Sequence, residues 1–124
     1  MSLSFFQRRK ILKGVNYLEL TPFRIYEHQV EENGLVTVLL PKFENKVLKT
    51  LFLSKNKSPF IHIKLDEFGS ETWLNLDGKN SVEKVATILI DKFGDRIQPV
   101  HERLTKFITQ LYLQKFITFN EIKK

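Results

Sequence analysis

The stretch from Phe60 to Gly78, FIHIKLDEFGSETWLNLDG, constrains the fold more than any other part of this chain. Its first residues alternate as those of a half-buried strand do: Ile61 and Ile63 fall on one face, and His62 and Lys64 fall on the other. The spacing of apolar residues then changes from that of a strand to that of a helix. A strand that leads directly into a helix is therefore predicted here.

The helical half of this stretch has a start signal and a stop signal. Asp66 is a suitable N-cap, because its carboxylate can accept hydrogen bonds from the unpaired N–H groups of the first turn. Gly69, one turn before Trp73, indicates close packing against the helix backbone. Asp77 and Gly78 favour a tight turn, since Gly accepts positive φ at little cost. The predicted inward face consists of Leu65, Phe68, Thr72, Trp73 and Leu76.

Two more helices and a closing strand are predicted downstream. Asn80 and Glu83 resemble a capping pair for the first of these helices, and Gly94 is a suitable terminator. The second begins at Pro99, a residue favoured at the first helical position, and Lys115 falls in its last turn. A short strand at 116–119 closes the chain. The apolar stripes are Val82, Val85, Ala86, Leu89 and Phe93 on one helix, and Val100, Leu104, Phe107, Ile108 and Leu111 on the other.

Antiparallel strands are predicted upstream of this region. Residues 24–30 are interpreted as one strand, residues 35–40 as its partner, and Pro41 ends the second strand. Asn33 and Gly34 between them favour a type I′ turn, in which both central residues take positive φ. Residues 43–54 carry apolar residues at helical spacing, so a helix is the first interpretation and a strand at 47–53 is the second.

The order of these elements predicts the fold class: α+β, a winged-helix-like domain in which N-terminal antiparallel β-strands precede three α-helices and a short C-terminal strand. With 124 residues the chain is expected to form one domain over residues 15–124, preceded by a basic extension over residues 1–14. There is no Cys, so a cytoplasmic location is expected. No apolar run is long enough for a transmembrane segment.

The N-terminal segment is basic and carries aromatic residues. Phe5 and Phe6 stand beside Arg8, Arg9 and Lys10, and residues 1–60 carry ten Lys and Arg against five Asp and Glu. An anchor on anionic lipid and an arm for nucleic acid are the functional interpretations. We adopt the plainer one, a frayed or lightly docked terminus, because so short a segment has no second anchor.

No catalytic or metal-binding constellation is predicted, and the chain is expected to be neither an enzyme nor a cofactor-binding protein. His28, His62 and His101 stand on separate predicted elements, and no pair of them has metal-ligand spacing. The acidic residues near Trp73 have structural explanations as caps and turn residues. Trp73 itself is expected in the core.

Binding to DNA is the competing interpretation, because winged-helix proteins often place their third helix in the major groove. The polar face of the predicted last helix offers a few suitable side chains: Arg103, Lys106, Gln110, Gln114 and Lys115. However, residues 61–124 carry ten basic against nine acidic side chains, so the electrostatic basis for phosphate binding is weak. Nucleic acid is therefore not the expected partner.

Three segments, LDEFGSETWLNLDG, SVEKVATILIDKFG and ERLTKFITQLYLQKFI, together resemble the PqqD-like family of peptide chaperones and precursor-peptide recognition elements. The resemblance covers roughly residues 35–119. It departs from the family pattern at residues 43–54, in the N-terminal extension, and at Lys115 or Phe116, where the family usually has Gly.

The resemblance implies a non-catalytic module that binds the leader segment of a ribosomally synthesised precursor peptide. The leader adds as a strand and is presented to a modifying enzyme, commonly a radical-SAM protein. Strands such as residues 61–64 can accept a visiting strand through their backbone groups. An alternative is a homodimer formed through the same edge strand. The predicted peptide-binding residues are Ile61, His62, Ile63, Lys64, Arg103, Phe107, Gln110 and Leu111.

Overall fold

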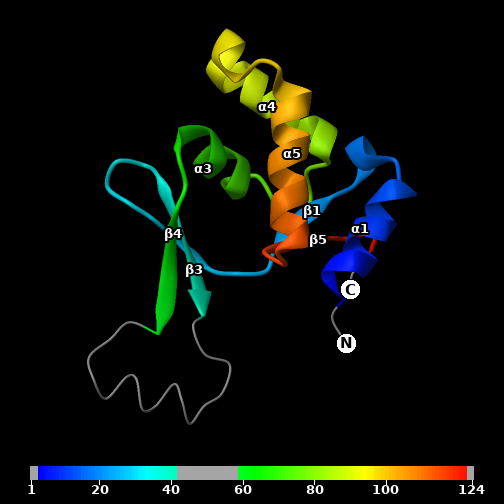
Figure 1. The fold of residues 1–124 in the computed structure, drawn as a ribbon. Helices are drawn as coiled ribbons and strands as arrows, with labels where there is room; N and C mark the ends of the chain where they lie inside the picture. Colours follow the sequence, from blue (N-terminus) through cyan, green and yellow to red (C-terminus); the bar gives the residue numbers. More distant parts are fainter. Residues whose placement is uncertain (1–2, 42–58, 123–124) are drawn as a thin grey trace.

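The computed structural model describes residues 3–41 and 59–122 (Figure 1). The element predicted at residues 43–54 lies outside the described residues. In chain order the elements are α1 (Phe5–Lys13), β1 (Pro22–Arg24), β2 (His28–Val30), β3 (Val36–Pro41), β4 (Phe60–Lys64), α3 (Glu67–Leu74), α4 (Val82–Phe93), α5 (Val100–Leu113) and β5 (Ile117–Phe119). The α+β class is confirmed. The described part contains four α-helices rather than three, because the N-terminal segment forms α1.

The strands that the structure describes form two separate sheets. One contains β2, β3 and β4 in that order, all antiparallel, and the other pairs β1 with β5. The prediction of a single strand over residues 24–30 is therefore wrong, since this segment crosses from one sheet to the other. Arg24 pairs with Ile117, whereas His28 pairs with Val38.

The hairpin between β2 and β3 is confirmed, but its turn type is not the predicted one. Gly34 has φ +85°, whereas Asn33 does not take positive φ. The Gly34 N–H donates to the Glu31 carbonyl at 2.9 Å, and the Glu31 N–H donates to the Leu35 carbonyl at 2.8 Å. This pattern matches the three-residue hairpin loop in which a turn is followed by a left-handed Gly. Only one residue then needs positive φ, and Gly supplies it.

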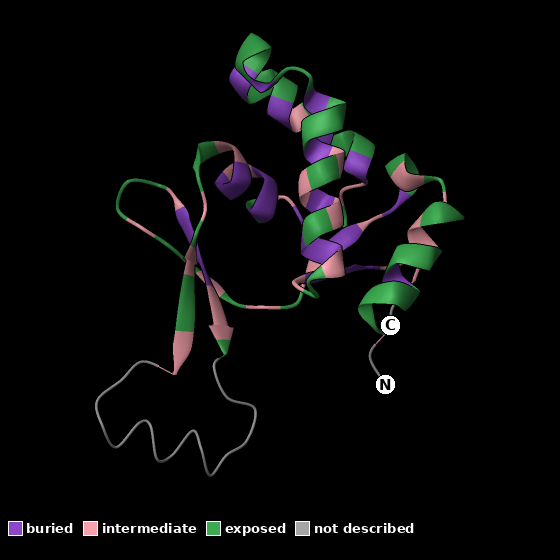
Figure 2. Ribbon diagram, viewed as in Figure 1, coloured by how far each residue is buried: buried purple, intermediate pink, exposed green. Residues whose placement is uncertain are grey.

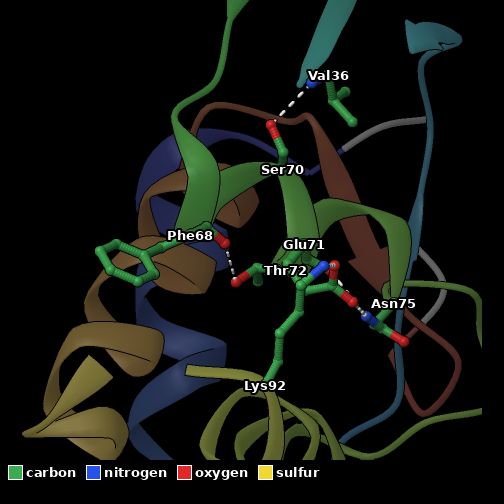
Figure 3. A network of polar contacts seen from close by, with 7 residues as sticks. All are labelled: Val36, Phe68, Ser70, Glu71, Thr72, Asn75 and Lys92. Carbon is green, nitrogen blue, oxygen red and sulfur yellow. Dashed lines mark hydrogen bonds and ion pairs between the residues drawn. The ribbon is translucent and has the colours of Figure 1, made fainter. Parts of the chain in front are cut away.

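Helix α3 is capped and fastened to the three-stranded sheet by polar contacts. The Asp66 carboxylate accepts from the Gly69 N–H at 2.7 Å, as predicted. Ser70 Oγ, buried at the helix–sheet junction, accepts from the Val36 N–H at 2.8 Å (Figure 3). On the opposite side of the helix, Lys92 of α4 forms a 2.6 Å ion pair with Glu71. Together these contacts fix the position of α3 between β3 and α4.

Helices α4 and α5 supply most of the hydrophobic core. The buried residues of α4 are the predicted stripe, and Gly94 ends the helix with φ +57°. The predicted capping pair is wrong by one residue, because the Ser81 hydroxyl, not Asn80, accepts the Lys84 N–H at 3.1 Å. Pro99 is the N-cap of α5 rather than its first residue. Figure 2 shows the buried positions lining the inner sides of these helices.

The C-terminal end of α5 adopts a Schellman motif with Lys at its left-handed position. The Phe116 N–H donates to the Leu111 carbonyl at 2.8 Å, and the Lys115 N–H donates to the Tyr112 carbonyl at 3.0 Å. Lys115 therefore lies beyond the last turn of the helix rather than in it, and has φ +67°. Gly is the usual residue at such a position because it has no Cβ.

Helix α1 docks on α5 through a buried arginine. The guanidinium of Arg8 donates to the Tyr112 carbonyl at 2.9 Å and to the Ile117 carbonyl at 3.0 Å, and it lies 4.5 Å from the centroid of the Tyr112 ring. Burial lowers the pKa of Arg8, while Tyr112 and Tyr26 act in the opposite direction. The N-terminal segment is thus a helix held in one orientation. Among the described residues, no helix is long and apolar enough to cross a membrane.

Candidate functional site

Strand β4 is an edge of the three-stranded sheet in the described part of the chain. The Leu65 N–H donates to the Val36 carbonyl at 2.9 Å, which fixes the alternation of the ladder. Because hydrogen-bonded pairs alternate along antiparallel strands, Ile63 and Ile61 direct their backbone groups toward β3. His62 and Lys64 direct theirs away from it. These two residues therefore present backbone donors and acceptors at the open edge.

A pocket of about 420 Å³ lies where β4 ends and α3 begins. It is bounded by β4, α3 and α5, with contributions from α4 and the turn that follows it. Most of its lining is apolar, with two cations, one carboxylate and one hydroxyl. The lining residues are Lys64, Leu65, Asp66, Phe68, Gly69, Thr72, Leu89, Ile97, Arg103, Leu104 and Phe107. A chain lying along the edge of β4 would meet this pocket at the C-terminal end of the strand.

Gly69 lines the pocket at a place where a larger residue would crowd its neighbours. A Cβ at Gly69 would stand 3.1 Å from the Asp66 carboxylate, 3.4 Å from the Phe107 ring and 3.5 Å from the Leu65 Cβ. The prediction of close packing at Gly69 is therefore confirmed. The close neighbours are the capping side chain and the ring that α5 extends toward α3.

Arginine side chains organise the rim of the pocket. Arg103 lies 4.6 Å from the centroid of the Phe68 ring and donates to the Arg96 carbonyl at 2.9 Å. Arg96 lies on the same ring at 5.5 Å and forms a 2.7 Å ion pair with Glu67. Both guanidinium groups therefore lie over the Phe68 ring. This ring also packs edge-to-face against Phe93, with 4.7 Å between the ring centroids. The pocket combines an apolar interior with a positively charged rim.

The outer face of the sheet carries a carboxylate close to this rim. The hydroxyl of Thr37 donates to Glu31 and holds the pKa of that carboxyl below its usual range. Gln29 lowers this pKa further, burial acts in the opposite direction, and Lys64 and His62 lower it again. Thr37 lies opposite Lys64 in the ladder. Glu31 is therefore ionised at neutral pH and offsets part of the positive charge on this face.

The structure brings some of the predicted peptide-binding residues together and separates others. Lys64, Arg103 and Phe107 line the pocket. Ile61 and Ile63 lie farther along β4, with side chains on the face opposite to those of His62 and Lys64. Gln110 is exposed on α5, outside the pocket lining. Leu111 is only 8% exposed and belongs to the hydrophobic core.

Several pocket residues were not among those predicted to bind peptide. Leu65, Phe68, Gly69 and Thr72 occupy one face of α3 and its N-terminal approach, at the spacing of successive helical turns. Leu89 and Ile97 come from α4 and from the turn after it. The helical spacing of these residues on α3 is visible in the sequence, but it predicts a face packed into the core rather than a pocket. The pocket is a gap in that packing.

The three histidines lie on separate elements, β2, β4 and α5. No group of three or more His, Cys, Asp or Glu side chains there could hold a metal ion. His28 packs edge-to-face on Trp73, and its pKa is lowered by burial and by Arg24. His101 lies 3.1 Å from Glu83 on the surface. The two residues therefore serve different parts of the fold.

Comparison with known proteins agrees with the resemblance noted in the sequence. Residues 61–117 match the model of the family described as Coenzyme PQQ synthesis protein D (PqqD). Searches of curated proteins and of solved structures gave no significant match. The matched segment begins in β4 and ends in β5, so it contains the open edge and all the pocket residues. The PqqD family consists of non-catalytic, peptide-binding accessory domains of peptide maturation. The match over residues 61–117 supports assigning this segment to the PqqD-like family.

Proposed function

We propose that this protein is a peptide-binding module that captures the leader segment of a ribosomally synthesised precursor peptide and presents it to a modifying enzyme, in the cytoplasm. The leader adds as a strand along the open edge of β4, and one of its side chains enters the pocket beside α3. The observation that carries the proposal is the continuity of an apolar pocket with β4, an edge strand of the sheet that the described residues form.

The backbone edge supplies only part of the binding free energy. His62 and Lys64 offer four donor and acceptor groups, and hydrogen bonds of this kind contribute about 0.5–1.5 kcal/mol each. Their sum of about 2–6 kcal/mol falls short of the roughly 8 kcal/mol that micromolar affinity needs. A large apolar side chain buried in the pocket adds about 1.5–3 kcal/mol. The pocket is therefore required for useful affinity and selects the leader.

The two competing functions, DNA binding and homodimer formation, would use residues that also belong to the proposed peptide site. For DNA binding, Arg103 would have to leave the Phe68 ring and the Arg96 carbonyl. For a homodimer through β4, a second copy would occupy the backbone groups of His62 and Lys64. Neither alternative makes use of the apolar pocket.

The test is a titration of the isotopically labelled protein with precursor peptides encoded beside its gene, followed by amide NMR. We expect shifts at His62, Lys64 and the pocket residues. The diagnostic variant is His62→Pro, because it removes an N–H that faces outward and leaves the β3 ladder intact. Ile63→Pro is the contrast, since it removes an N–H that bonds to β3 and should destabilise the sheet itself.

The expected result is that His62→Pro keeps the thermal stability of the parent within a few degrees and loses peptide binding. Undiminished binding by a folded His62→Pro protein would refute strand addition at this edge. Size-exclusion chromatography of the parent protein and of His62→Pro distinguishes self-association from peptide binding. A steep salt dependence of binding to duplex DNA would instead support the competing function.

A further inference from the structure

Helix α1 exposes its aromatic residues and buries one charged residue, although its Leu12 packs against the core. Phe6 is 78% exposed, whereas Arg8 is 3% exposed. Phe5 and Phe6 pack edge-to-face at 5.6 Å, so the two rings form one protruding unit in the first turn of the helix. The hydrogen bonds of Arg8 to α5 and β5 fix this rotation of the helix. The exposure of the rings is therefore built into the fold.

Cations share the outward face of α1 with Phe6. Arg9, Lys10 and Lys13 lie three, four and seven positions after Phe6, so all four side chains fall within one helical face. All three cations are exposed, and none forms an ion pair with a residue that the structure describes. The face thus combines an aromatic unit with unpaired positive charge.

Acidic residues are missing from α1 where a helix would favour them. Its capping box is completed by Gln7, whose side chain accepts from the Ser4 N–H at 2.7 Å. Glu commonly fills this position, and a negative charge there would favour the helix dipole. With a neutral residue instead, α1 carries four cations and no anion. The outward face keeps its full positive charge.

We propose that this face of α1 is a peripheral anchor for the surface of an anionic lipid bilayer. The Phe5–Phe6 pair enters the headgroup layer, and Arg9, Lys10 and Lys13 reach the lipid phosphates. The face is a convex helix surface, and the lysines that dominate its charge are depleted from protein–protein interfaces. A diffuse anionic surface complements it better than a shaped protein partner does.

This anchor and the peptide site can act together. In Figure 1, α1 and β4 lie on opposite sides of α5, and none of the outward residues of α1 lines the pocket. A bilayer bound through α1 leaves the edge of β4 open. The inference is independent of the proposed function, because peptide binding and vesicle binding can be measured separately.

The test is co-sedimentation of the full chain with phosphatidylcholine vesicles, with and without phosphatidylglycerol. We expect binding to the anionic vesicles, little binding to the neutral ones, and a decline as salt is raised. The triple variant Arg9→Gln/Lys10→Gln/Lys13→Gln should bind about a hundredfold more weakly. Phe5→Ser/Phe6→Ser, which keeps the charge, should bind about tenfold more weakly.

The matched control is Lys79→Gln/Lys84→Gln/Lys106→Gln, which removes the same charge from exposed positions outside α1. It should bind vesicles nearly as well as the parent. An equal loss in the control, or equal binding to neutral vesicles, would overturn the proposal. The proposal would also be overturned if the protein bound duplex DNA but not vesicles, and if the α1 variants abolished that DNA binding. Circular dichroism and melting temperature confirm that each variant is folded.

Discussion

Replacing Arg8 by Ala should detach α1 from the rest of the domain, and the structure indicates the cost. The Ile117 carbonyl points away from β1, because the hydrogen-bonded pairs of that ladder fall on its neighbours: the Ile25 N–H donates to the Phe116 carbonyl. Arg8 is the partner of the Ile117 carbonyl among the described residues. Its loss would leave a carbonyl in a buried setting without a hydrogen bond.

The magnitude follows from the separate contacts. An orphaned buried acceptor costs about 1–3 kcal/mol. The Tyr112 carbonyl retains the Lys115 N–H at 3.0 Å, so that carbonyl is not left unpaired. The contact of the guanidinium with the Tyr112 ring contributes about 1 kcal/mol. These favourable contacts are partly offset, because Nε of Arg8 is buried and has no hydrogen-bond partner among the described residues. We expect a net loss of about 3 kcal/mol in the free energy that docks α1.

Hydrogen exchange measures this loss element by element. In Arg8→Ala, the amides of α1 should exchange nearly as fast as in an unfolded peptide, while the buried amides of α4 and α5 stay protected. Urea denaturation gives the total change. Arg8→Lys should fall between the parent and Arg8→Ala, because an ammonium cannot keep the planar stack and both bonds.

Arg9→Ala is the matched control, since Arg9 is exposed on the adjacent position of the same helix. It should change stability by less than about 0.5 kcal/mol. If Arg8→Ala had no larger effect than Arg9→Ala, the reasoning about buried hydrogen bonds would be refuted.

Three further substitutions test single features of the fold. Lys115→Gly should stabilise the protein by about 1 kcal/mol because φ is +67° there, whereas Gln114→Gly, one residue earlier at φ −85°, should destabilise it; thermal denaturation compares them. Asp66→Ala should cost about 1 kcal/mol in urea denaturation and Asp66→Asn little, since Asn also caps; equal costs would contradict the capping role. Burial raises the pKa of Tyr17 to about 12, against its hydrogen bond to Thr109, so the neutral form is favoured in the folded state. The stability that the neutral Tyr17 side chain contributes is fully present below about pH 10 and is lost as the pH rises toward 12. Tyr17→Phe should weaken this alkaline decline in stability, and an unchanged profile would contradict the assignment.

The elements that the sequence alone identified are those whose signals are local. The stripe of α4 follows from the 3.6-residue period, and the cap at Asp66 follows from a side chain that bonds its own helix. The alternation in β4 is equally local, since neighbouring side chains must point to opposite faces. The error at residues 24–30 arose because part of that segment pairs with β5, which lies at the other end of the chain.

The site depended on tertiary structure for the same reason. The sequence indicated that residues 61–64 form a strand, but only the sheet order made β4 an edge, and only the register assigned the outward backbone groups to His62 and Lys64. The pocket joins α3 to α5 across some forty residues of sequence, and no local pattern marks a gap in packing. The sequence predicted a frayed or lightly docked terminus, so the docked orientation of α1 was likewise decided by tertiary contacts. Two distant backbone carbonyls, at Tyr112 and Ile117, turned Arg8 inward, since buried acceptors left without hydrogen bonds are costly.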